Sequence, residues 1–168
     1  MAGRDLQIRE IVAEGITTIL RNDPRWLRCD IKSVSLLPNI LSFQEANEAG
    51  SMECIFTRDG MMTECAHSNV FFVIDGKVFT HPESENILSG VTRKNVIDVA
   101  RKAGVSVIEI PVAASRLPEV SEAFITNTSF EIAPVISIDG MKVGSGKPGP
   151  VTLQLREEFD RHTAGLRT

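Results

Sequence analysis

A lysine and a glutamate stand out as residues that could carry out chemistry together. Lys32 ends a short apolar, strand-like run that begins near Arg25, and Glu64 is expected on a later strand. A lysine amine forms a Schiff base with an aldehyde, and a carboxylate can hold the pyridinium nitrogen of pyridoxal phosphate and keep that ring an electron sink. Lys32 taken alone would be an ordinary solvated lysine, so the case depends on the residues around the pair.

A cofactor phosphate needs hydrogen-bond donors, and the segment Ser89–Thr92 offers them. Gly90 lets the backbone approach an anion closely, the next amides point toward it from the start of an expected helix, and the Thr92 hydroxyl adds a donor. The alternative interpretation is a simple turn followed by a helix capped by Thr92.

A second group of small polar donors, Thr126–Ser129, directly follows the strand-like segment Ala123–Ile125. A polar loop explains the same residues equally well. Arg25 could add a charge-assisted contact to a phosphate, worth roughly 1.5–3 kcal/mol, or could form a surface salt bridge instead.

The composition restricts the class of protein. The 168 residues fit one domain with a real core, and 18 basic against 22 acidic residues give a net charge of −4. There is no basic stripe for nucleic acid, no apolar run long enough for a membrane, and no signal-peptide core at the N-terminus. Three cysteines at unrelated spacings match neither a zinc site nor a disulfide framework, which favours a reducing, cytoplasmic compartment.

Three Asp-Gly pairs predict β-hairpins, because Asp-Gly supplies the positive φ angles of a tight turn. They are Asp59-Gly60, Asp75-Gly76 and Asp139-Gly140. The flanking strands are expected at residues 52–57 and 61–64, 69–74 and 77–80, and 135–138 and 141–143. Antiparallel pairing should therefore dominate, which argues against a doubly wound parallel sheet.

Helices are expected at residues 38–49, 92–103 and 151–162, and a further helix at 5–14 precedes a strand at 16–20. Pro38 lies near the start of the first of these, and Gly50 should stop it. The second has basic residues in its last turn and Gly104 just beyond its end.

Several separated segments together resemble one known family. They are Arg25–Ser33, Leu36–Asn39, Gln44–Ala46, Thr63–Glu64, Ser68–Phe71, Ile87–Arg93, Thr126–Val135 and Gly146–Thr152. In this order and spacing the chain resembles the D-amino-acid (D-alanine) aminotransferases, which are class IV, fold type IV pyridoxal-phosphate enzymes. The resemblance covers nearly the whole chain after about Gly15.

The resemblance implies a role for each matching position. Lys32 would form the Schiff base with pyridoxal 5′-phosphate and then shuttle protons, Glu64 would bond the pyridine nitrogen, and Leu88 would pack against the cofactor ring. The phosphate ligands would be Arg25, Gly90, Val91, Thr92, Asn127 and Thr128.

Two departures from the family pattern affect these expectations. Where the family commonly has glycine and serines, this chain has Cys65-Ala66-His67-Ser68, so His67 is either a polar wall of the site or a loop-packing residue. Family members also carry an N-terminal small domain that supplies an active-site tyrosine and groups that bind the substrate carboxylate, some from the partner subunit. The chain contains no tyrosine, and residues 1–168 are expected to be the cofactor-binding large domain of a homodimer, without the small domain.

The resemblance implies an α+β fold with an antiparallel, barrel-like sheet and flanking helices. It also implies amino-group transfer between a D-amino acid and a 2-oxo acid, incomplete in this chain alone. An aminodeoxychorismate-lyase-like enzyme of the same fold and a non-catalytic cofactor-binding or association module are the alternatives. A branched-chain L-amino-acid aminotransferase is disfavoured because the lysine segment lacks the usual Gly-Asn-Tyr pattern.

Overall fold

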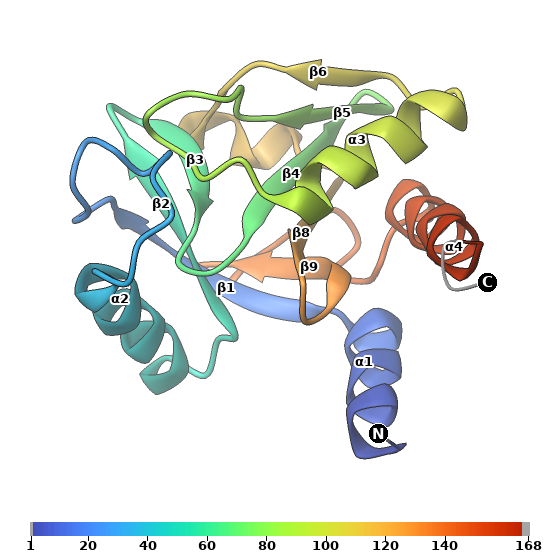
Figure 1. Cartoon of the computed structure of the whole chain (residues 1–168), viewed down its shortest axis with the longest axis horizontal. Coiled ribbons are helices and arrows are strands. Elements are labelled where there is room, and N and C mark those ends of the chain that lie inside the picture. The colour runs from blue at the N-terminus through green and yellow to red at the C-terminus, as the bar shows by residue number, and fades with distance from the viewer. Residues whose placement is uncertain (1, 166–168) are drawn as a thin grey trace.

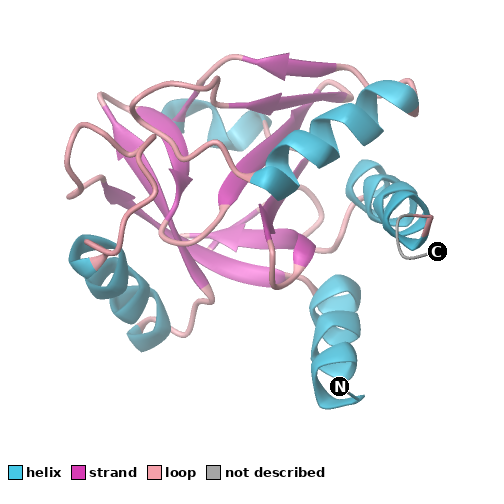
Figure 2. Cartoon of the chain, viewed as in Figure 1, coloured by secondary structure: helices cyan, strands magenta, loops and turns pink. Residues whose placement is uncertain are grey.

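The computed structural model describes residues 2–165 and places helices around one curled sheet (Figures 1 and 2). The helices are α1 (Ala2–Glu14), α2 (Leu37–Glu48), α3 (Val91–Lys102), the 3₁₀ helix η1 (Ala114–Glu119) and α4 (Pro150–Ala164). The strands are β1 (Ile16–Asn22), β2 (Glu53–Arg58), β3 (Met61–Cys65), β4 (Asn69–Ile74), β5 (Lys77–Thr80), β6 (Val107–Glu109), β7 (Val112–Ala113), β8 (Glu122–Asn127), β9 (Glu131–Ile138) and β10 (Met141–Lys142). The predicted α+β class with flanking helices is confirmed.

The three predicted hairpins are present. Asp-Gly turns join β2 to β3, β4 to β5 and β9 to β10, and both residues of each turn have positive φ, for example 52° at Asp59 and 76° at Gly60. Two consecutive positive φ angles match the right-handed twist of the paired strands. The local sequence was therefore sufficient to predict these turns.

Antiparallel pairing dominates the sheet, as predicted, but β1 pairs in parallel with both β2 and β9, and β5 pairs in parallel with β6. The strands follow the order β6-β5-β4-β8-β9-β1-β2-β3-β7, with β10 added beside β9. The parallel pairs join segments that are separated by a helix or by most of the chain. Hairpin signals report only on neighbours in sequence, so they could not reveal these pairs.

The sheet curls into a half-barrel (Figure 1), and both of its faces carry buried side chains. On β4, Val70, Phe72 and Ile74 point into the central core, whereas Phe71 and Val73 point outward under α3 and α4. This alternation follows from the two-residue period of a strand. A third cluster packs α2 against β1 and β2 on another side of the sheet.

The loop before α2 differs from the sequence-based expectation. Residues 23–36 form turns and irregular structure rather than a strand-like run. The apolar side chains there, among them Trp26 and Leu27, are largely exposed and have no neighbouring strand to pair with. A second correction concerns the helix start: α3 begins at Val91, and Gly90 rather than Thr92 is its N-cap residue.

Between residues 2 and 165, no helix combines the length and the apolar character needed to cross a bilayer.

Candidate active site

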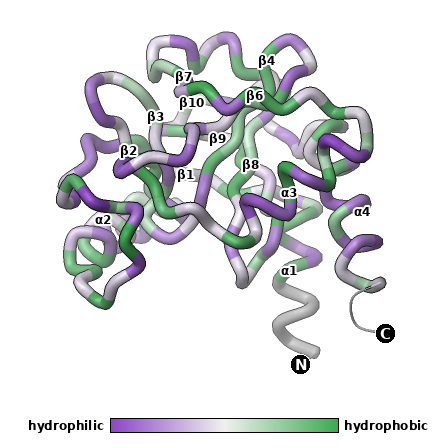
Figure 3. Tube along the Cα trace, turned by 45° about the horizontal axis from the view of Figure 1, so that its top comes forward, coloured by the Kyte–Doolittle hydropathy of each residue, from purple (hydrophilic) through white to green (hydrophobic). Residues whose placement is uncertain are grey.

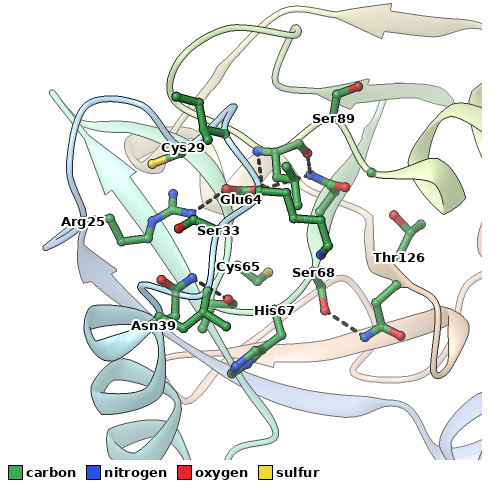
Figure 4. Close-up of a pocket in the computed structure, with 18 of the residues that line it drawn as sticks. Arg25, Cys29, Ser33, Asn39, Glu64, Cys65, His67, Ser68, Ser89 and Thr126 are labelled. Atoms are coloured by element: carbon green, nitrogen blue, oxygen red, sulfur yellow. Dashed lines mark hydrogen bonds and ion pairs between the residues drawn. The ribbon is translucent and has the colours of Figure 1, made fainter.

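One cavity of about 500 Å³ at the rim of the half-barrel brings the predicted site residues together (Figure 4). Its walls come from the loop between β1 and α2, the adjoining ends of β3 and β4, the segment that leads into α3, and the end of β8. The predicted residues that line it are Arg25, Lys32, Glu64, Leu88, Gly90, Val91, Thr92, Asn127 and Thr128. Residues more than 100 positions apart in sequence therefore share one binding space.

Glu64 is held in the wall of this cavity by hydrogen bonds to both carboxylate oxygens. Its Oε1 accepts a hydrogen bond from Arg25 Nη1 at 2.5 Å. Its Oε2 accepts from Asn69 Nδ2 at 3.0 Å and from the Leu88 backbone amide at 3.0 Å. The Asn69 amide also donates to the Leu88 carbonyl, which ties β4 to the segment before α3. Glu64 is thus a buried acceptor with a fixed orientation.

Arg25 contacts Glu64 and not the residues that are expected to donate hydrogen bonds to a phosphate. Its Nε and Nη2 donate to the two oxygens of Asp23 at 2.9 and 2.8 Å, and its guanidinium stacks over Phe56, 4.6 Å from the ring centroid. Burial lowers the pKa of Arg25, but its hydrogen bonds to Asp23 and the charge of Glu64 outweigh this and raise it. These contacts assign Arg25 to the Glu64 carboxylate, and its role as a phosphate ligand stays a prediction.

The ionisation of Glu64 is finely balanced. Burial raises the pKa of Glu64 to about 7, even though the charge and hydrogen bond of Arg25 lower it. Part of the ligand-free population therefore carries a protonated Glu64 at neutral pH. A cationic ring nitrogen placed next to this oxygen pair would favour the carboxylate form.

We expect the ligand-free chain to lose stability as the pH rises from about 4.5 to about 7. In this window the folded state, with a Glu64 pKa near 7, binds the proton more tightly than the unfolded chain, whose value is near 4.5. The free energy of unfolding must therefore fall with rising pH, and this contribution levels off above pH 7. Glu64→Gln should make the decrease in the free energy of unfolding between pH 4.5 and 7 smaller by up to about 3 kcal/mol.

Urea unfolding between pH 4.5 and 8 measures this effect, with Glu48→Gln, an exposed change on α2, as the control. If Glu64→Gln and Glu48→Gln show the same pH dependence as the parent chain, the stated titration of Glu64 is wrong.

The start of α3 forms a cradle of backbone donors. Among the described residues no side chain caps this helix at Gly90, so its first amides are free to bind an anion. A Cβ at Gly90 would overlap the Asn69 side-chain oxygen, which explains why only glycine fits there. Thr92 is buried in the first turn and also lines the cavity.

Asn127 is fixed at the end of β8 with its amide oriented by three contacts. Its Oδ1 accepts from the backbone amides of Ser129 and Phe130 at 2.9 and 2.8 Å, which closes the turn into β9. Its Nδ2 donates to Ser68 Oγ at 2.9 Å. The turn therefore holds Asn127 and Thr128 at the cavity wall in a defined geometry.

Lys32 lies in the loop before α2, lines the same cavity and is exposed to solvent. Within residues 2–165 the structure gives the Lys32 amine no hydrogen bond or ion pair. An amine without a competing partner is available to bind a ligand from this side of the cavity.

Sequence reasoning missed several residues that shape this site. Asn69 orients Glu64, and Asp23 holds Arg25; their proximity in sequence to Ser68 and Arg25 was the only available signal. His67, which the sequence offered as a polar wall or as a loop-packing residue, lines the cavity and also packs its ring edge-on against Phe43, 4.7 Å between centroids. Burial lowers the pKa of His67, which favours its neutral form.

The chain is similar to known proteins in both sequence and fold. A family model described as amino-transferase class IV matches residues 4–138. The D-alanine aminotransferase of Listeria monocytogenes serotype 1/2a is 46% identical over 146 residues, which cover 87% of this chain and 50% of that protein. The chain thus spans about half the length of the curated relatives it matches.

Two solved structures are similar in fold. The branched-chain amino acid aminotransferase of Escherichia coli superposes with a TM-score of 0.83 at 33% identity, covering 90% of this chain and 52% of that one. The T.th. branched-chain amino acid aminotransferase with pyridoxamine 5′-phosphate gives a TM-score of 0.85 at 31% identity, covering 92% of this chain and 52% of that one.

Proposed function

The chain belongs to the class IV aminotransferase family, and from this premise we propose that it forms the pyridoxal-phosphate-binding part of an enzyme that transfers an amino group between a D-amino acid and a 2-oxo acid. The observation that carries the proposal is the convergence of Lys32, Glu64 and two groups of phosphate donors on one cavity. Cavities of roughly 300–1,000 Å³ are typical of small-molecule sites.

The residues present fit pyridoxal phosphate. The uncapped start of α3 and the cradle at Gly90 suit a phosphate group. Both oxygens of Glu64 are held in place by donors, so the carboxylate can face a ring nitrogen without rearranging. Lys32 supplies an amine from the same cavity wall. The donor set is therefore suited to an anion at one end and a cationic ring nitrogen at the other.

When bound, pyridoxal phosphate supplies an aldehyde that binds amines and a ring that accepts the electrons released at the substrate Cα. Lys32 would hold the cofactor through its aldehyde and would take up and return the proton at the substrate Cα. Glu64 would hold a proton on the ring nitrogen, and Arg25 orients Glu64 and favours its carboxylate form. The start of α3 and the Asn127 turn would hold the phosphate.

A D-alanine-like substrate is supported by sequence identity. The 46% identity with the D-alanine aminotransferase of Listeria monocytogenes exceeds the 33% identity with the branched-chain enzyme of Escherichia coli. We also propose a reducing, cytoplasmic location, since Cys29, Cys54 and Cys65 are all buried free thiols.

An exposed apolar surface next to the cavity supports association with a second copy of the chain. This surface, here called the 26–41 patch, comprises Trp26, Leu27, Ile31, Val34, Leu36, Leu37, Ile40 and Leu41. Apolar colouring on and beside α2 marks this region in Figure 3. Exposed patches of this kind mark interaction sites. Three of its residues, Trp26, Ile31 and Leu36, also line the cavity, so a partner seated there would help to close the site.

We expect the isolated 168-residue chain to associate and yet to transfer amino groups poorly. The part of the relatives that this chain does not span is proposed to hold the substrate carboxylate, and orientation by such groups cannot be replaced by the lysine. Amino transfer from D-alanine to 2-oxoglutarate should be at most about one-hundredth of that of a full-length D-alanine aminotransferase. Light scattering should give the mass of a dimer or a larger assembly.

Two variants sharpen the measurement of association. Val34 is the most exposed residue of the 26–41 patch, at 97%, and Val34→Asp should lower the mass toward that of a monomer. Ile110→Asp changes a residue that is 56% exposed beside β6, outside the patch, and should leave the mass unchanged. A monomeric chain that transfers the amino group of D-alanine as fast as a full-length relative would overturn this proposal.

A further inference from the structure

Behind the cavity wall lies a buried carboxylate that the chemistry above does not use. Glu53, at the start of β2, is 3% exposed and does not line the cavity. Its Oε1 accepts from the Cys54 amide at 3.0 Å, and its Oε2 accepts from the His67 amide at 3.2 Å and from Ser68 Oγ at 3.0 Å. A buried carboxylate is costly unless such donors satisfy it, so its position needs an explanation.

The contacts of Glu53 continue into the candidate phosphate site. Ser68 gives its single hydroxyl proton to Glu53 and accepts from Asn127 Nδ2 at 2.9 Å. The other end of the Asn127 amide closes the turn between β8 and β9. A continuous chain of hydrogen bonds therefore runs from Glu53 through Ser68 to Asn127.

We propose that Glu53 is a positioning residue that orients Asn127 and its turn for phosphate binding, acting through Ser68. The proposal rests on the proposed function, because it takes the phosphate of pyridoxal phosphate as the group bound at this turn. The Cys54 amide, the His67 amide and the Ser68 hydroxyl all donate to Glu53, so a carboxylate, which accepts on both oxygens, suits all three contacts. Acceptance at Oε2 keeps the Ser68 proton directed away from Asn127. The Ser68 oxygen is then left to receive the Asn127 amide.

Glu53→Gln tests this arrangement closely. The amide group of glutamine has one donor end, and that end must face either the Cys54 amide or the pair formed by Ser68 and the His67 amide. In the second case Ser68 loses its acceptor and its hydroxyl can rotate. The hydroxyl proton can then point toward the Asn127 amide, which is itself a donor, and the Ser68–Asn127 hydrogen bond is weakened. In the first case Ser68 keeps its acceptor and the Cys54 amide loses one. In neither case is a residue that lines the cavity replaced.

The decisive measurement compares the affinities of the 168-residue chain for pyridoxal 5′-phosphate and for pyridoxal, which lacks the phosphate. Glu53→Gln should weaken binding of pyridoxal 5′-phosphate about 3- to 10-fold, the equivalent of one hydrogen bond, and change the affinity for pyridoxal less than about twofold. Ser68→Ala should give the same selective loss, and the double variant should lose no more than either single one, because both changes break one chain of contacts.

Glu122→Gln is the matched control. Glu122 is a buried carboxylate on β8 that accepts hydrogen bonds from the Val151 amide and from the amide and hydroxyl of Thr152 at the start of α4. Its replacement should reduce stability in thermal unfolding but leave the ratio of the two affinities unchanged. If Glu53→Gln does not fold, Ser68→Ala carries the test alone.

The outcomes separate this inference from the proposed function. A parent chain that does not prefer pyridoxal 5′-phosphate over pyridoxal overturns both. If the parent chain prefers pyridoxal 5′-phosphate, and Ser68→Ala and any folded Glu53→Gln keep that preference in full, the positioning role of Glu53 is wrong. The proposed function is then unaffected. Equal losses for both ligands would show that Glu53 supports the fold and not the phosphate site.

Discussion

Borohydride treatment of the chain in the presence of pyridoxal phosphate is expected to leave the cofactor on Lys32, and Lys32→Ala is expected to abolish that label. The reason is geometric: Lys32 lines the cavity that also holds Glu64 and the candidate phosphate donors, and its amine has no partner within residues 2–165. Peptide mapping by mass spectrometry identifies the modified residue. Loss of the proton-moving amine should also slow exchange of the D-alanine α-proton by about 10²- to 10⁴-fold.

Lys94→Ala provides the control for this experiment. Lys94 lies in the first turns of α3, close to the candidate phosphate cradle, but it is exposed, pairs with Glu83 and does not line the cavity. Its replacement should leave the label on Lys32 intact. A label found mainly on another lysine, or no label at saturating cofactor, would remove the central claim about the site.

The sequence was a good guide wherever the signal was local. The turn at Asp59-Gly60 has the predicted hairpin geometry because positive φ angles are a property of those two residues. Glu64 lies on a strand as predicted, because β3 directly follows that turn. Gly104 follows α3 with a φ of 75°, as expected of a residue that ends a helix.

The signal failed where a residue's environment comes from distant parts of the chain. Arg25 binds Glu64, which is 39 positions away, and this pairing depends on how β3 and the preceding loop pack in space. The strand-like pattern near Lys32 was misleading, because Trp26 and Leu27 are apolar without being buried in this chain. Such residues fit a surface that another chain or domain covers, and a periodicity argument cannot distinguish that case from a buried strand.

The network around Glu64 also could not be predicted from spacing. Asn69 and the Leu88 amide reach one oxygen from β4 and from the segment before α3, while Arg25 reaches the other oxygen from the loop before α2. Three separate elements therefore converge on one carboxylate. This convergence is the physical reason to expect a large effect from a change of a single atom at this position.

Glu64→Gln is expected to leave cofactor affinity within about tenfold of the parent value while slowing α-proton exchange by about 10²- to 10³-fold, the range seen when a preorganised electrostatic contact is lost. A neutral amide cannot hold a proton on the ring nitrogen, so the ring accepts the electrons released at Cα less well. The phosphate cradle at Gly90 is untouched and continues to anchor the cofactor. The amide would also place a donor against Arg25 or against Asn69, which accounts for the modest loss of affinity.

The measurement pairs a cofactor titration with nuclear magnetic resonance of D-alanine in deuterated buffer, and free pyridoxal phosphate gives the rate without protein. Glu48→Gln, on the exposed face of α2, controls for the loss of one negative charge. Exchange that falls together with cofactor affinity would assign Glu64 to binding rather than to chemistry. Exchange that is unchanged in Glu64→Gln would show that this buried carboxylate serves only to join β3 to Arg25 and Asn69.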